Sequence, residues 1–189
     1  MLHVLGGPCH VQVLGLQKVW NHEGVADREI DLVAEARRQW RAHGWQGPDR
    51  GMTAVISLMR AQQIVLGRLE DAVRPFGVSF ARYEILTLLS FTRGGELPLS
   101  RIGERLQVHP ASVTGAIDKL EAQGLVVRVR SAADRRSVLA RLTDRGREVA
   151  EQATAALNAG PFSDIGLAPE RAELLVEVLT ELRRDAGDF

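Results

Sequence analysis

The sequence is poor in cysteine, lysine and aromatic residues, and it contains no long hydrophobic run. Cys9 is the only cysteine, so the chain can form no internal disulfide, which fits a reducing compartment. No apolar run approaches the roughly 20 residues that would cross a bilayer. The first residues lack the basic segment and the long apolar core of a secretory leader. We therefore expect a cytoplasmic protein without a membrane partner.

Motifs of common enzyme classes are also missing. The sequence has no Walker-type phosphate loop, no H-E-x-x-H zinc motif, no G-x-S-x-G elbow and no dinucleotide fingerprint. Its histidines are scattered without the pairing typical of zinc ligands, at His3, His10, His22, His43 and His109. We expect no catalytic residue, no metal site and no cofactor.

Positive charge is concentrated in one short segment, although the chain has no net charge. Residues 128–147 contain seven arginines and two acids, giving this window +5, while the remainder carries −5. Such a concentration indicates either a polyanionic partner or a solvated charged face. The total of 22 arginines against two lysines also reflects genomic base composition, so arginine content alone does not indicate DNA binding.

The periodicity of apolar residues predicts a mainly α protein with a small β-hairpin. Glycine and proline breaks, with Ser79 as a helix cap, separate the elements, and residues 93–98 are expected to form a turn. Helices are predicted at about 27–43 (capped by Asp27), 53–74, 79–92, 99–106, 110–123, 143–160 and 169–184, and strands at 125–130 and 137–143. Two short helices followed by a hairpin form the layout of a winged helix.

The second short helix has one apolar and one small, polar face. Val113, Ile117 and Leu120 recur at helical spacing and should be buried. The opposite face carries Ala111, Ser112, Thr114, Gly115, Asp118 and Lys119. Small methyl and hydroxyl groups allow close approach to base edges in a major groove. The alternative is the solvated face of a structural helix.

The hairpin that follows places Arg128 and Arg130 on one face of its first strand. Its tip holds Asp134, Arg135 and Arg136. A guanidinium at a hairpin tip can enter a narrow minor groove, and a neighbouring carboxylate can orient it. The alternative is a solvated wing whose charges prevent aggregation of strand edges.

The segment "DRRSVLARLTDRG" resembles the wing signature of the MarR family of transcription regulators, a D-x-R…L-T…G pattern. The matching residues are Asp134, Arg136, Leu142, Thr143 and Gly146. "SVTGAIDKLEAQGLVVR" is similar to the recognition helix of that family and its exit into the wing. The resemblance covers residues 53–184 in element order and is most specific over 100–146.

The resemblance implies a winged helix-turn-helix lobe, at about 80–143, joined to a helical dimerisation bundle. The bundle helices would be those at about 53–74 and 144–184, within a domain spanning 51–189. Residues 1–50 form an N-terminal extension that is a candidate part of the dimer interface. Arg136 would be the minor-groove arginine, with Asp134 as its positioning partner. The DNA-binding residues would be Ser112, Thr114, Lys119, Arg130, Asp134, Arg135 and Arg136.

The partner implied by the resemblance is double-stranded DNA with an inverted-repeat operator, bound by a homodimer that acts as a repressor. Regulators that resemble this one often release DNA when a small aromatic or lipophilic effector binds between bundle and lobe. The positions predicted for such an effector are Met59, Gln63, Arg82 and Tyr83. The remaining alternative is a winged-helix protein-interaction module without specific DNA binding.

Overall fold

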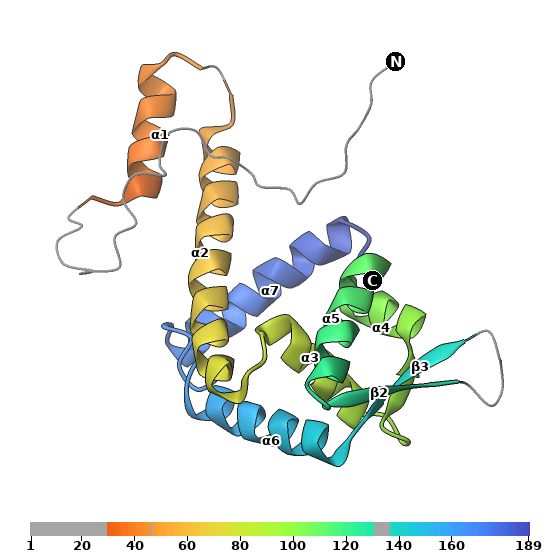
Figure 1. The fold of residues 1–189 in the computed structure, drawn as a ribbon. Helices are drawn as coiled ribbons and strands as arrows, with labels where there is room; N and C mark the ends of the chain where they lie inside the picture. The colour runs from red at the N-terminus through yellow and green to blue at the C-terminus, as the bar shows by residue number, and fades with distance from the viewer. Residues whose placement is uncertain (1–29, 46, 131–136) are drawn as a thin grey trace, which may run out of the picture. The chain divides into compact units, whose positions relative to one another are not determined.

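The computed structural model describes residues 30–45, 47–130 and 137–189. The chain divides into two units, Met1–Ile56 and Ser57–Phe189. The elements, shown in Figure 1, are α1 (Leu32–Ala42), α2 (Asp49–Val73), the 3-10 helix η1 (Arg74–Phe76), α3 (Phe80–Ser90), β1 (Glu96–Pro98), α4 (Leu99–Leu106), α5 (Pro110–Ala122), β2 (Val126–Arg130), β3 (Val138–Leu142), α6 (Asp144–Ala159) and α7 (Pro169–Asp185).

The described part of the first unit is held by ion pairs between α1 and the first residue of α2. Arg37 Nε and Arg41 Nε donate to the same Asp49 oxygen, at 2.9 and 2.6 Å. The hydrogen bond from Arg37, followed by that from Arg41, lowers the pKa of the Asp49 carboxyl. The predicted cap at Asp27 lies outside the described residues. The helix α1 begins at Leu32, where the Asp31 side chain accepts from Val33 N.

The second unit contains the winged-helix lobe. Its sheet has three antiparallel strands in the order β1-β3-β2, and β2 pairs with β3 from Val126↔Leu142 to Arg130↔Val138. The prediction that residues 93–98 form only a turn is wrong, because Glu96–Pro98 pairs with β3 as an edge strand. The mainly α fold class with a β-hairpin wing is confirmed.

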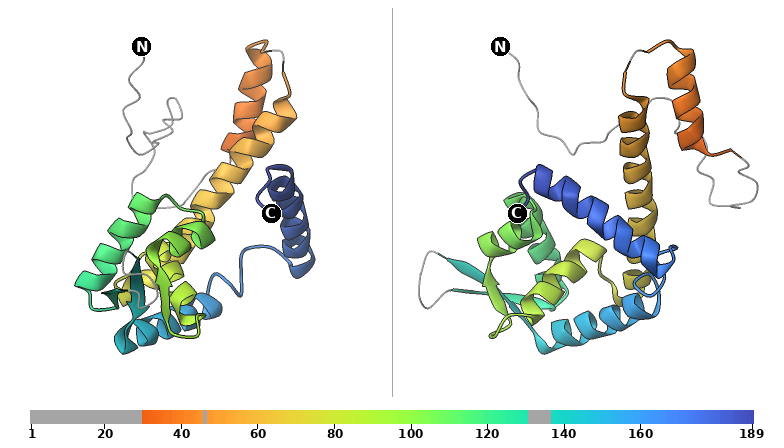
Figure 2. Two further views of the ribbon diagram at one scale, coloured as in Figure 1. Left: turned by 90° about the vertical axis from the view of Figure 1, so that its right-hand side faces the viewer. Right: turned by 180° about the vertical axis from the view of Figure 1, so that it is seen from behind.

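One hydrophobic core connects α3, α4, α5 and α6 with the sheet. The predicted inward residues of α5, Val113, Ile117 and Leu120, are all buried. They pack in one cluster with residues such as Leu86 of α3 and Leu157 of α6. The core therefore fixes which face of α5 remains exposed (Figure 2).

The start of α6 explains the L-T…G part of the wing signature. Thr143 caps this helix by accepting from Gly146 N at 3.0 Å, while its hydroxyl lies 2.8 Å from Gly124 O and 3.1 Å from Leu125 O. A Cβ built on Gly146 would lie 2.0 Å from Leu125 O. Only glycine therefore permits this approach between α6 and the turn that leads into β2.

The long helix α7 contributes no buried residue, and the structure describes all of it. Leu174, Leu175, Val178 and Leu182 are between 37% and 54% exposed. The segment after α7 contacts the turn between α4 and α5, where Asp188 accepts a hydrogen bond from Gln107 and pairs with Arg183.

Candidate nucleic-acid interface

The amino end of α5 is capped by an unusual residue. His109 Nδ1 accepts from Ala111 N at 3.2 Å, and Pro110 occupies the first turn. A serine or threonine more often caps a helix in this way, so the sequence did not indicate the role of His109. The first turn of α5 is thereby held with its small side chains in solvent.

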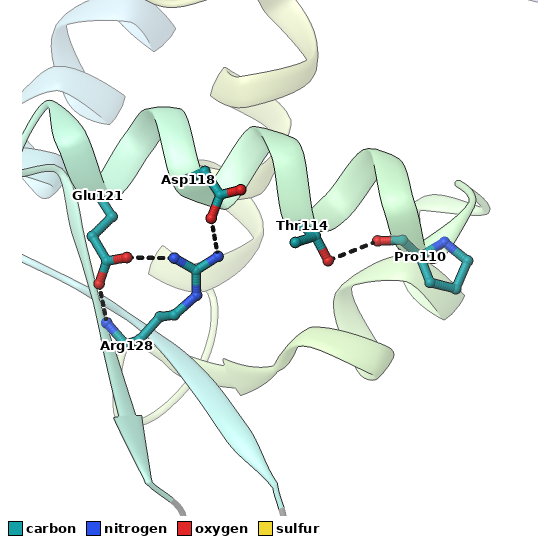
Figure 3. A network of polar contacts seen from close by, with 5 residues as sticks. All are labelled: Pro110, Thr114, Asp118, Glu121 and Arg128. Atoms are coloured by element: carbon teal, nitrogen blue, oxygen red, sulfur yellow. Dashed lines mark hydrogen bonds and ion pairs between the residues drawn. The ribbon is translucent and has the colours of Figure 1, made fainter. Parts of the chain in front are cut away.

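Three predicted DNA-binding residues share the exposed face of α5. Ser112, Thr114 and Lys119 are all exposed. The Thr114 hydroxyl donates to Pro110 O at 3.1 Å (Figure 3), so its lone pairs remain able to accept. The core residues and the cap together present hydroxyl groups and a cation on one helix face.

Arg128 has a structural role that the sequence did not indicate. Its guanidinium pairs with Asp118 at 2.5 Å and with Glu121, and its backbone amide donates to Glu121 at 3.0 Å (Figure 3). The hydrogen bond to Asp118, with the contribution of Glu121, raises the pKa of Arg128 above its usual value. Two carboxylates balance this charge, so Arg128 fastens β2 to α5 instead of offering a free cation with Arg130.

The remaining wing residues lie at or beyond the end of β2. Arg130 is exposed and is the last residue of that strand. Asp134, Arg135 and Arg136 fall outside the described residues. Their roles in DNA binding stay predictions.

The residues predicted for an effector are not gathered at one place. Met59 and Gln63 are exposed on α2. Tyr83 is buried in the core, with its hydroxyl 3.0 Å from Thr154 Oγ1 of α6. Arg82 instead faces α5, where its guanidinium donates to Gln123 Oε1 at 3.2 Å.

The described residues contain no group of three or more histidine, cysteine or acidic side chains that could hold a metal ion. Over the same part of the chain, no helix is long and apolar enough to cross a membrane.

Comparisons with known proteins agree with this arrangement. A model of the MarR family matches residues 79–138. The HTH-type transcriptional regulator YkoM of Bacillus subtilis (strain 168) is 39% identical over 106 residues, which are 54% of this chain and 66% of that relative. The match therefore spans just under two thirds of YkoM.

Two solved structures extend the comparison. Sco5413, a MarR family transcriptional regulator from Streptomyces coelicolor, is 47% identical with a TM-score of 0.68, over 74% of this chain and 97% of that chain. The transcriptional repressor CouR, solved with a 23-mer DNA duplex, is 28% identical with a TM-score of 0.62, over 67% of this chain and 89% of that chain. This chain belongs to the MarR family of DNA-binding transcriptional regulators, which carry a winged helix-turn-helix.

Proposed function

We propose that this protein is a sequence-specific repressor that binds an inverted-repeat operator as a homodimer. The observation that carries the proposal is the exposed face of α5, which presents Ser112, Thr114 and Lys119, on a helix joined to β2 by the Arg128–Asp118 ion pair. Hydroxyl groups can bond to base edges, whereas the lysine suits a phosphate. The repressor assignment is supported by CouR, a repressor solved on DNA. We also infer a cytoplasmic location, because such a regulator must reach chromosomal DNA.

The homodimer is supported by apolar side chains that one chain leaves in solvent. The stripe on α7 is one such surface, and Met59, Ile64 and Leu66 of α2 are between 38% and 51% exposed. Large exposed apolar patches usually mark an interface. In the N-terminal extension, Trp45 is 56% exposed and is a candidate for the same role. A two-fold dimer would place two α5 helices about 34 Å apart, one turn of DNA, so the operator should be an inverted repeat.

The proposal also includes an effector, a molecule whose binding releases the protein from DNA. CouR from Rhodococcus jostii RHA1 has been solved with p-coumaroyl-CoA, whose acyl group is aromatic, and this supports an aromatic effector for this chain. Met59, Gln63 and Tyr83 remain the proposed positions, whereas Arg82 faces α5. Since Tyr83 is buried, its contact with an effector would require α3 or α6 to move.

Arg136→Ala is expected to weaken operator binding by about 1–3 kcal/mol, the usual cost of removing one specific interaction with a base pair. Fluorescence anisotropy with an operator defined by footprinting measures this change. Arg38→Ala is the matched control, because it removes an exposed arginine of α1. Equal affinity of Arg136→Ala and the parent protein would refute the role of the wing. A footprint without two symmetric half-sites would refute the inverted repeat.

A further inference from the structure

A hollow of about 280 Å³ lies between the first turn of α3 and the exposed face of α5. The sequence did not indicate this hollow, because α3 and α5, which form its two sides, are separated along the chain by the helix α4. Its lining includes Ser79, Arg82, Ser112, Gly115 and Lys119.

Small side chains keep this hollow open. Four of its lining residues are alanine or glycine. A Cβ built on Gly115 would meet no atom within 4 Å. A group from another molecule can therefore approach the backbone of α5 closely at this position.

The two cations of the hollow differ from Arg128 in how their charges are balanced. Among the described residues, Arg82 is oriented by neutral acceptors only, with Nε 3.2 Å from Ser79 Oγ and Nη1 3.2 Å from Gln123 Oε1. Gln123 is fixed in turn, since it donates to Gly77 O at 2.8 Å. Within the described residues, no carboxylate pairs with Arg82 or Lys119. The guanidinium is thus held in place while its positive charge stays uncompensated.

We propose that this hollow binds a phosphodiester group of the DNA backbone when α5 lies in the major groove. The inference rests on the proposed function, and it reassigns Arg82 from the effector site to DNA. A planar guanidinium can donate two parallel hydrogen bonds to a phosphate, while the lysine acts as a point charge. The Ser112 hydroxyl on the same wall can donate a further bond. Interactions of this kind with the DNA backbone fix how a recognition helix is placed on the duplex.

The test compares salt dependence in three variants of the full-length protein. Arg82→Gln and Lys119→Gln each remove one charge, and Gly115→Gln fills the hollow without changing charge. Arg74→Gln is the matched control, because Arg74 is exposed and already paired with Asp71. Anisotropy titrations use the operator duplex and a shuffled duplex at several salt concentrations, and thermal unfolding verifies that each variant is folded.

Arg82→Gln is expected to bind both duplexes about tenfold more weakly at 0.1 M salt if it removes one ion pair with a phosphate. The slope of log K against log salt should fall by about 0.9 for each phosphate that is no longer neutralised. Gly115→Gln should also bind more weakly, whereas Arg74→Gln should match the parent. An unchanged slope in Arg82→Gln would overturn the proposal, as would weakening confined to the operator, which would indicate base reading.

The two proposals can fail separately in this experiment. If the parent protein binds the operator and the shuffled duplex with equal affinity, the proposal of a sequence-specific repressor is refuted. A reduced slope of Arg82→Gln on the shuffled duplex would still support the phosphate site. If the parent prefers its operator and Arg82→Gln keeps the full slope, only the phosphate site fails.

Discussion

Gly146→Ala is expected to lower the free energy of unfolding by about 3 kcal/mol, because the added methyl group meets backbone. Its Cβ would lie 2.0 Å from Leu125 O and 2.8 Å from Leu142 Cδ1. Relief requires α6 to move away from the turn before β2. That movement would break the bonds from Thr143 N and Thr143 Oγ1 to Leu125 O, each 3.1 Å long.

Urea denaturation followed by circular dichroism measures this destabilisation, and operator binding should fall with it because the wing is anchored at this junction. Gly115→Ala is the control, because it also replaces a helical glycine by alanine. Its Cβ enters open space on an exposed helix face, so stability should rise by about 0.5–1 kcal/mol. If Gly146→Ala is as stable as the parent, the structural reason given for this signature glycine is wrong.

Val178→Glu is expected to convert the proposed homodimer into monomers and to weaken operator binding by about 10²–10⁴-fold, because avidity is abolished. Leu174, Val178 and Leu182 recur at i, i+4 and i+8 and share one face of α7. Val178 is 54% exposed in a single chain, so a charge there costs the folded monomer little. In an apolar interface the same charge would be buried without a partner, which is strongly unfavourable.

Val176→Glu provides the matched control. Val176 is 64% exposed and lies two positions from Leu174, so it points away from the stripe. Light scattering should give a dimer for the parent protein and for Val176→Glu, and a monomer for Val178→Glu. A dimer that survives Val178→Glu would exclude this stripe as the interface, and a monomeric parent would exclude the homodimer.

Most helices were predicted from the sequence because their caps and the spacing of their apolar residues can be read within a few neighbouring positions. Ser79 accepts from Arg82 N as a cap, and α4 has the predicted bounds, Leu99–Leu106. The strand β1 was not predicted because three residues that include Pro98 show no alternation, and its partner strand lies far along the chain. The helix α2 begins at Asp49, before the predicted 53, because Gly51 is tolerated in its first turn.

The sequence predicted the part of the candidate site that lies within one helix, but not the contacts between different elements. The exposed face of α5 follows from the spacing of Val113, Ile117 and Leu120. The pairing of Arg128 with Asp118 joins a strand to a helix, so it depends on tertiary packing. The hollow depends on packing in the same way, since Arg82 meets α5 only after α3 is placed in the core. Periodicity within one segment carries no information on such contacts.

Binding of the parent protein to DNA from immediately upstream of its own gene, at about 50 and 200 mM salt, tests the central claim most directly. We expect tight binding that exceeds binding to a shuffled duplex. If about 6–10 phosphates are neutralised, affinity should fall by about 10³–10⁵ between these salt concentrations. Weak binding, equal on both duplexes and insensitive to salt, would contradict a DNA-reading role and favour a winged helix that binds protein.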